Sequence, residues 1–287
     1  MDRDLLEDLF RTAVAAADPA RAIAAHLPEK PRGRTVVVGA GKASAQMAAA
    51  FERLWPGPLT GLVVTRYGYA APTRQIEIVE AAHPVPDEAG YLAARRIMAQ
   101  VHGLGPDDLV VALISGGGSA LLPAPGPGMS FEDEQAVNRA LLNSGMPIGV
   151  MNLVRNELSA IKGGRLAALA APASVATLIV SDVPGDDPAL VASGPTVPIA
   201  GTRQEVRHLV ALHGLALPPA ATALLAGNDN LPPRPDDPRF ARNSVRIIAS
   251  SALSLDAAVP ILCQQITRRP MSRWVALRQN GFVGVGT

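Results

Sequence analysis

The chain has 287 residues, with 48% hydrophobic and 18% charged content, so it can bury a sizeable core. Its single cysteine excludes a disulfide framework within the chain and any metal cluster built on cysteines. The net charge of +1 gives no electrostatic reason to expect nucleic acid or an anionic membrane as a partner.

Residues 3–27 carry leucine, phenylalanine, alanine and valine at helical spacing and predict an amphipathic helix at the start of the chain. This N-terminus is acidic where a signal peptide would be basic and then apolar. No apolar run in the chain approaches the roughly 18 residues that a membrane helix needs. We therefore expect a cytoplasmic protein.

A unit of strand, glycine turn and helix first appears at residues 35–55 and recurs along the chain. Six short apolar runs, mostly separated by helical stretches, predict an α/β fold: a doubly wound, mainly parallel six-stranded sheet with helices on both faces, like the Rossmann arrangement. The runs are "TVVV", "GLVV", "IEIV", "DLVVALI", "SVATLIV" and "VRIIA".

Between the fourth and fifth runs the sequence predicts two helices. Ser130 with Asp133 three residues later predicts the start of the first, which ends at Gly145. The second is expected to end at Gly163 and Gly164.

The unusual residues of the chain come directly after the strands, in loops such as "GAGKAS", "AAHPVP", "SGGGSA" and "SDVPGDD". Ligands of open parallel sheets bind outside the carboxyl ends of the strands, so we expect these loops to share one rim. His83 lies on that rim, where a lone histidine is more often structural than catalytic.

The loop after the fourth strand places three glycines between two serines. A backbone without Cβ atoms can turn so that several N–H groups point into one concavity, which then binds an anion. A flexible connector is the alternative, but connectors do not usually follow a buried run so abruptly. The cofactor-binding residues predicted here are Ser115, Gly116, Gly117, Gly118 and Ser119.

The loop after the first strand, "GAGKAS", resembles two phosphate motifs and satisfies neither. Ser44 replaces the third glycine of a dinucleotide fingerprint, and Ala43 replaces the hydroxyl residue of a Walker A loop. What remains is a lysine at a helix N-terminus, where a cation opposes the helix dipole unless an anion lies between them. We therefore expect Lys42 to contact a phosphate or carboxylate, with Gly39 and Gly41 as further cofactor-binding residues. A solvated surface lysine is the alternative.

Three aspartates crowd into the loop after the fifth strand. Carboxylates at a strand end can coordinate Mg²⁺ through one or two oxygens, while water and phosphate fill the remaining positions. Ordinary turn chemistry is the alternative. A lysine and a glycine-rich loop nearby favour the metal interpretation, with Asp182 and Asp186 as the ligands.

These loops together resemble one known family. The segments "VVVGAGKAS", "HPVPDEAG", "LISGGGSALL", "NLVRNELSAIKGGRLA" and "SDVPGDDPALVASGPT" are similar to the ordered motifs of the class II glycerate kinases, or glycerate 2-kinases; some relatives carry the name hydroxypyruvate reductase. The resemblance implies ATP-dependent phosphorylation of D-glycerate to 2-phosphoglycerate, with magnesium, in a cleft between two α/β domains.

Carried onto matching positions, the resemblance implies that Lys42 is the main catalytic cation. It also implies that the substrate contacts Lys162, Ser193, Gly194 and Thr196. Two alternatives remain open: reduction of hydroxypyruvate with NAD(P)H, against which the broken fingerprint argues, and a fragment that binds glycerate or phosphate without catalysis. A homo-oligomer also remains open.

The resemblance covers about residues 3 to 257 and then stops, whereas family members continue into a second domain. From Ala258 the chain holds four arginines and no acid or lysine, and Pro260 is expected to break the helix that begins before it. We expect residues 1–257 to form the N-terminal α/β domain and residues 258–287 a poorly ordered tail, produced by truncation or a frameshift, with the second domain missing. A genuine short variant with a partner chain is the alternative.

Overall fold

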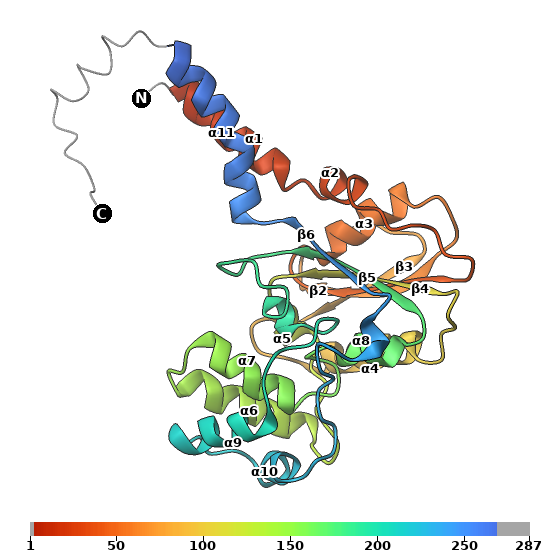
Figure 1. The fold of residues 1–287 in the computed structure, drawn as a ribbon, viewed down its shortest axis with the longest axis vertical. Helices are drawn as coiled ribbons and strands as arrows, with labels where there is room; N and C mark the ends of the chain where they lie inside the picture. Colours follow the sequence, from red (N-terminus) through yellow and green to blue (C-terminus); the bar gives the residue numbers. More distant parts are fainter. Residues whose placement is uncertain (1–2, 269–287) are drawn as a thin grey trace, which may run out of the picture. The chain divides into compact units, whose positions relative to one another are not determined.

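The computed structural model describes residues 3–268. The chain forms two compact units, a larger one of Pro19–Ser250 and a smaller one from the residues up to Asp18 and from Ser251 onward (Figure 1). The larger unit holds the sheet and every residue predicted to belong to the site.

Six strands form one sheet in the order β3-β2-β1-β4-β5-β6, and every neighbouring pair is parallel. The predicted six-stranded parallel sheet is confirmed. The chain adds β2 and β3 on one side of β1, and it adds β5 and β6 on the far side of β4. The order of the strands therefore reverses between β1 and β4, and the carboxyl ends of these two strands form the switch point at which such sheets bind ligands. The strands are β1 (Thr35–Ala40), β2 (Thr60–Arg66), β3 (Ile76–Ala81), β4 (Leu109–Ser115), β5 (Ser174–Val180) and β6 (Ser244–Ala249).

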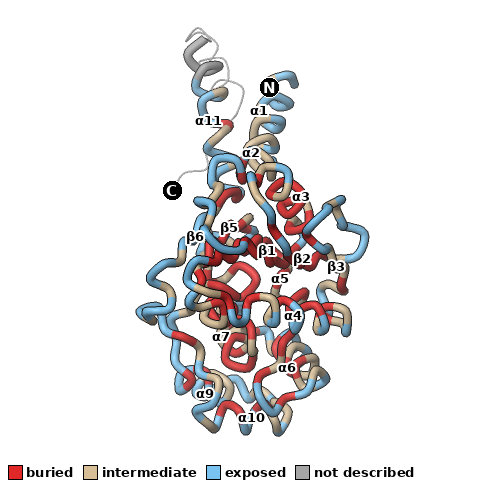
Figure 2. Tube along the Cα trace, turned by 90° about the vertical axis from the view of Figure 1, so that its right-hand side faces the viewer, coloured by how far each residue is buried: buried red, intermediate tan, exposed pale blue. Residues whose placement is uncertain are grey.

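Helices cover both faces of the sheet, and every residue of the two central strands is buried (Figure 2). One face carries Val37 in a core with Phe51 of the helix that follows β1. The opposite face carries Val38 in a core with Ile97 of the helix that follows β3. The first face is covered by α2 (Pro19–Ala24) and α3 (Ser44–Leu54), the second by α4 (Glu88–Val101) and α8 (Arg165–Ala170).

Four further helices form a group with a core of its own, built on residues such as Leu141, Val154 and Leu225. They come from two separate parts of the chain, the connection between β4 and β5 and the connection between β5 and β6. The group consists of α6 (Phe131–Asn143), α7 (Ile148–Glu157), α9 (Arg203–Leu212) and α10 (Pro219–Ala226). Short elements complete the unit: α5 (Gly118–Leu121), η1 (Val191–Ser193) and η2 (Pro238–Phe240).

The predicted start of α6 is confirmed, because Ser130 and Asp133 form a reciprocal capping box. The predicted end of α7 is wrong. The helix ends at Glu157, well before Gly163, because Ser159 forms a β-bridge with Pro125 and so leaves the helical path.

The smaller unit pairs the first and the last described helices, α1 (Arg3–Ala16) and α11 (Ser251–Arg268), which lie side by side in antiparallel directions (Figure 1). The predicted N-terminal helix is therefore two helices, since α2 starts afresh at Pro19. The break expected at Pro260 is also wrong, because α11 continues through that residue. A proline within a helix removes one hydrogen bond, and packing against a neighbouring helix can offset that loss. The rest of the expected tail, residues 269–287, lies outside the described residues.

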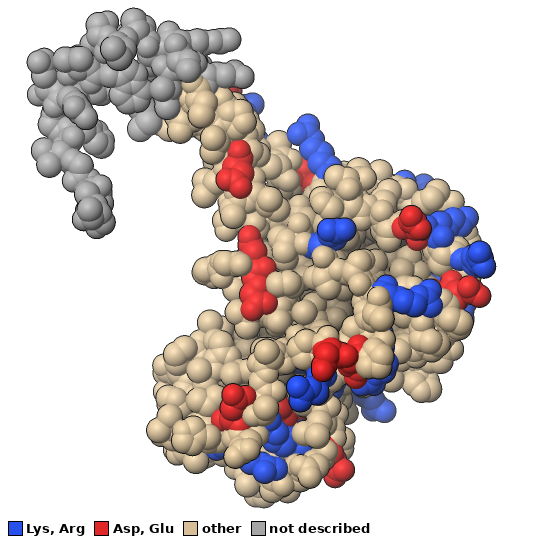
Figure 3. Space-filling view, viewed as in Figure 1, with Lys and Arg blue, Asp and Glu red and all other residues tan. Residues whose placement is uncertain are grey.

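Within residues 3–268, no helix combines the length and the apolar character that crossing a bilayer requires. Acidic and basic side chains are interspersed over the face of the larger unit that Figure 3 shows.

Candidate active site

The loops that follow β1 and β4 are bonded to each other at the switch point. The N–H of Lys42 donates to the carbonyl of Gly116 (2.9 Å), and the N–H of Ala43 donates to Ser115 Oγ (3.0 Å). Ser44 Oγ lies 3.1 Å from Ser115 Oγ. Ser115, a predicted binding residue, is buried, and the contacts of its hydroxyl group with Ala43 and Ser44 hold the two loops together.

Side chains packed against the second loop explain why it needs glycines. A Cβ at Gly116 would lie 1.9 Å from Asp182 Oδ2. Gly117 has a φ of +86°, and a Cβ there would lie 3.0 Å from both His83 Nε2 and Lys42 Cε. The glycines therefore allow a lysine, a histidine and an aspartate from three different loops to meet on one stretch of backbone.

The same backbone presents a row of unused donors. Within the described part of the chain, the N–H groups of Gly116, Gly117, Gly118 and Ser119 donate to no protein acceptor. Successive free N–H groups beside a left-handed residue make a concavity that binds anions. The predicted anion loop thus has the donors that its role requires.

Lys42 and Asp182 face each other across this loop, with Nζ 4.0 Å from Oδ2. Both side chains are about half exposed, at 45% and 54%, so the pair is weak in water. A negatively charged ligand can therefore bind Lys42 without breaking a strong ion pair.

His83 joins these two residues from the loop after β3. Burial, followed by the positive charges of Lys42 and Arg66, holds the pKa of His83 below its usual value, against the opposing effect of Asp182. Its surroundings therefore favour the neutral form of the imidazole. From the sequence, this histidine was expected on the ligand rim, where a structural role is the more common one.

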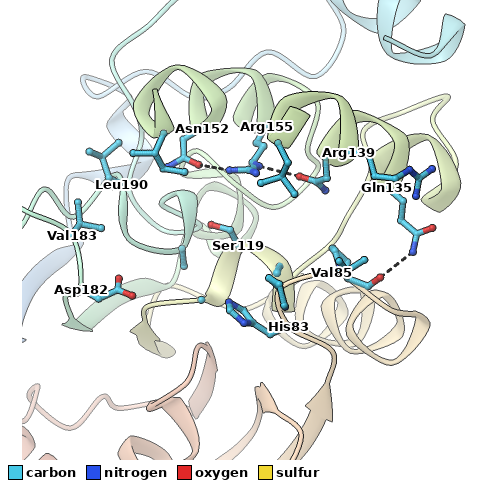
Figure 4. Close-up of a pocket in the computed structure, with 18 of the residues that line it drawn as sticks. His83, Val85, Ser119, Gln135, Arg139, Asn152, Arg155, Asp182, Val183 and Leu190 are labelled. Atoms are coloured by element: carbon cyan, nitrogen blue, oxygen red, sulfur yellow. Dashed lines mark hydrogen bonds between the residues drawn. The ribbon is translucent and has the colours of Figure 1, made fainter. Parts of the chain in front are cut away.

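A pocket of about 380 Å³ opens between these loops and the helices α6 and α7 (Figure 4). His83, Ser119 and Asp182 approach it from the loops, and Arg155 and Asn152 approach it from the helices on the other side. Lys42 lies beside this pocket, against the lining residue Gly117.

The helical wall of the pocket was missed by the sequence analysis. Arg155 donates from Nε to Asn138 Oδ1 (3.0 Å) and from Nη1 to Asn152 Oδ1 (3.1 Å). Asn152 also accepts from Ser193 Oγ (3.4 Å), which lies 2.8 Å from Ser119 Oγ. A chain of polar contacts thus links the helices to the glycine loop. Its only signal in the sequence is the polar residues within an amphipathic helix, which are typical of many solvated helix faces.

Three predicted substrate residues support the site from behind. Ser193 is fully buried and bonded as described, and Gly194 has a left-handed φ of +55° with backbone oxygens against its Cα. Thr196 is buried too, and its Oγ1 lies 2.9 Å from Thr177 Oγ1. None of the three lines the pocket. In the structure these three residues pack behind the loops that line the pocket and stabilise them.

Lys162, the fourth predicted substrate residue, lies apart from the pocket. Its side chain is 2% exposed, and Nζ donates to the carbonyl of Leu122 (2.8 Å) and to Glu134 Oε1 (3.2 Å). Two of the three donors of this ammonium group are thus used within the protein, and Lys162 is not among the residues that line the pocket. Its surroundings are those of a structural ion pair.

The glycines predicted in the first loop serve close packing. Gly39 lies within β1, where a Cβ would meet the carbonyl oxygen of Leu113 at 2.3 Å. Gly41 has a φ of +142° and packs in the same way against Ser115.

The two predicted metal ligands differ in position. Asp182 lines the pocket, whereas Asp186 sits in a left-handed turn outside it. In the region that the structure describes, no group of three or more His, Cys, Asp or Glu side chains is placed to hold a metal ion. The donors suit Mg²⁺ only in the form in which one carboxylate is supplemented by water and phosphate oxygens.

Comparison with known proteins places these motifs in a wider group. A family described as "Domain of unknown function (DUF4147)" matches residues 5–226. A provisionally named hydroxypyruvate reductase of Agrobacterium vitis is 53% identical over 257 residues, 89% of this chain and 58% of that protein. The D-glycerate 2-kinase of Thermotoga maritima is 40% identical over 215 residues, 74% of this chain and 52% of that protein.

The crystal structure of a glycerate kinase from Thermotoga maritima has the same fold, with a TM-score of 0.83 and 32% identity. The match covers 91% of this chain and 62% of that one. This chain spans about half the length of the curated relatives that it matches.

Proposed function

This chain belongs to the DUF4147 family together with glycerate kinases, and from that premise we propose that it carries the nucleotide and acceptor sites for ATP-dependent phosphorylation of D-glycerate. The phosphoryl group would move to the 2-hydroxyl and give 2-phosphoglycerate. The chain spans about half of its relatives, so the activity of the whole protein is part of the proposal.

One observation supports the proposal above all: Lys42, Asp182 and the free N–H groups of Gly116–Ser119 converge on one loop at the switch point of the sheet. Phosphoryl transfer requires little covalent chemistry from a protein. It requires positioning and stabilisation of the charge on the transferred group. A lysine, an anion-binding backbone and a carboxylate suited to magnesium supply these.

Each of these groups has a distinct role in the proposal. The backbone N–H groups hold phosphate oxygens of ATP, and Lys42 neutralises charge on the phosphoryl group in transfer. Asp182 is the residue that would hold magnesium, which when bound offsets the charge of the phosphate oxygens. Asp186 and Lys162 have no part in the proposal, because neither lines the pocket nor contacts the glycine loop in the way that Lys42 and Asp182 do.

The acceptor hydroxyl must also lose its proton as its oxygen bonds to phosphorus. His83 lines the pocket with its ring against the glycine loop, in surroundings that favour a neutral imidazole, so we assign to this ring the acceptance of that proton.

The experiment is a coupled ADP-release assay of the purified chain with ATP and Mg²⁺, with and without D-glycerate, and with the product identified by ³¹P NMR. Lys42→Met should abolish the glycerate-dependent rate. The matched control is Lys30→Met, which removes an exposed lysine that does not line the pocket. Hydroxypyruvate-dependent oxidation of NADPH in place of ADP release would favour the reductase alternative.

If wild-type protein releases no glycerate-dependent ADP, calorimetric titration with ATP and with D-glycerate separates the remaining cases. Binding of both without turnover would leave a non-catalytic binding unit. Binding of neither would refute the proposed function for this chain.

A further inference from the structure

The helical wall of the pocket holds two arginines, the exposed Arg139 and the partly buried Arg155, and burial makes the unmatched charge of Arg155 the costly one. Arg155 on α7 lines the pocket and is partly buried, and its bonded partners, Asn138 and Asn152, are neutral amides. A guanidinium has five N–H donors, so these two bonds leave three of them, on Nη1 and Nη2. The two amides fix the plane of the group while its outer edge stays available (Figure 4).

The charges around Arg155 do not balance. In residues 3–268, no carboxylate oxygen lies within 4.0 Å of its guanidinium nitrogens. The acid that affects it most is Glu134, whose Oε1 is bonded to Lys162 at 3.2 Å. Arg155 and Lys162 therefore have the single acid Glu134 between them, which leaves one positive charge in excess.

Burial lowers the pKa of Arg155, and the attraction of Glu134 opposes this only in part. A buried charge without a counter-ion destabilises a fold. If Arg155 served only to link α6 to α7, a carboxylate partner would stabilise the fold more than the two neutral amides do. The unmatched charge at a pocket wall indicates that the counter-ion comes from a ligand.

The orientation of Arg155 is linked to the glycine loop. Asn152 accepts from both Arg155 and Ser193, and Ser193 in turn contacts Ser119. The guanidinium and the N–H groups of the loop thus hold fixed positions on opposite sides of one pocket. This suits an acceptor with an anionic group at one end and a reacting group at the other.

We propose that Arg155 binds the carboxylate of the acceptor and thereby selects a small hydroxy acid over an uncharged polyol. The proposal rests on the proposed function, since it takes this pocket as the acceptor site. A carboxylate fits the planar edge of a guanidinium with two parallel hydrogen bonds, whereas the phosphates already have the backbone N–H groups and Lys42.

The test compares three ligands, D-glycerate, glycerol and ATP, by calorimetric or NMR titration of the whole chain. Arg155→Gln should weaken D-glycerate at least about 30-fold and leave ATP within about twofold, because only the carboxylate loses its charged partner. Glycerol, which lacks the carboxylate, should bind both proteins alike. Retained ATP binding shows in the same samples that the variant is folded, and Arg155→Lys should recover part of the affinity.

Arg95→Gln is the control for the change in charge, since Arg95 is an exposed residue of α4 outside the pocket. Unchanged D-glycerate binding in Arg155→Gln, or no D-glycerate binding by the wild-type chain, would overturn the proposal. An equal loss of ATP would assign Arg155 to the nucleotide phosphates instead. Glycerate binding that depends on Arg155 in a chain that does not bind ATP would support this proposal and refute the kinase function.

Discussion

The carboxylate of Asp182 lies against the Cα of Gly116, so close that a Cβ there would be 1.9 Å from Oδ2. No Cβ can occupy that space unless the carboxylate of Asp182 moves away from the loop after β4. The identity of one glycine thus controls the position of the carboxylate that we propose for magnesium.

Gly116→Ala should therefore displace Asp182 and weaken the binding of Mg²⁺-ATP by about tenfold or more, with a smaller effect on ATP in the absence of magnesium. Titration with ATP at several magnesium concentrations measures this difference. Gly149→Ala on α7 is the control, since a Cβ there meets nothing within 4 Å and alanine favours a helix. Equal weakening with and without magnesium would contradict the role of Asp182.

The pKa of His83 should respond to its neighbour Lys42. An NMR titration should give His83 a pKa below 6.5, because burial and nearby positive charge disfavour the imidazolium. Lys42→Met removes one of these charges and should raise that pKa, whereas Lys30→Met should not change it. A pKa of His83 that is the same in all three proteins would place Lys42 away from the imidazole in solution.

The same shift has a consequence for stability. The folded-state pKa of His83 lies below that of the unfolded chain, so the unfolded chain binds the proton more readily. The free energy of unfolding should therefore fall as the pH drops through about 6.5 and below. His83→Gln should reduce this pH dependence, as urea unfolding at a series of pH values can measure. An unchanged dependence in the variant would assign it to other groups.

Asp108 should stabilise the fold down to acidic pH. It accepts from the side chain and the N–H of Arg34 and from the N–H of Gly105, which lowers its pKa to about 2. This contribution is present above the unfolded pKa near 3.8 and is lost as the pH falls through about 2. Asp108→Asn should cost about 1–2 kcal/mol at pH 7, and its exposed neighbour Asp107→Asn close to nothing. Equal losses would show that Asp108 has no special partners.

The buried ion pair between Arg203 and Glu157 should matter far more than the exposed pairs. Its atoms lie 2.8 Å apart with side chains 5% and 4% exposed, and Arg203 also donates to four backbone carbonyls between Leu224 and Asn230. Arg203→Met should cost about 3–5 kcal/mol because it leaves Glu157 buried and unpaired. The control Arg234→Ala removes an exposed pair and should cost less than about 0.5 kcal/mol in chemical denaturation. Similar losses would contradict this ranking.

The sheet could be predicted from the sequence because β-branched runs alternate with helices, and that pattern is local. The meeting of Lys42 with the glycine loop could be predicted for the same reason, since parallel strands end at one rim. The pocket wall was not predictable in this way. Arg155 lies on α7, and its importance depends on an acid of α6 being paired elsewhere, which is a property of the packed structure.

Other predictions show the same limit of local patterns. Lys162 and Thr196 were predicted as substrate contacts because they belong to motifs rich in polar residues, and the structure adds that both side chains are buried with internal partners. The helix break expected at Pro260 followed a local rule, whereas α11 continues through that residue in contact with α1.

The pairing of α1 with α11 has a consequence for synthesis in the cell. The partner of α1 lies more than two hundred residues later in the chain, so α1 must wait for it until the sheet unit between them has been translated. During that interval its partly buried side chains, such as Leu5 and Leu9, lack that partner. A chaperone that recognises short apolar helices would find a target in this segment of the nascent chain.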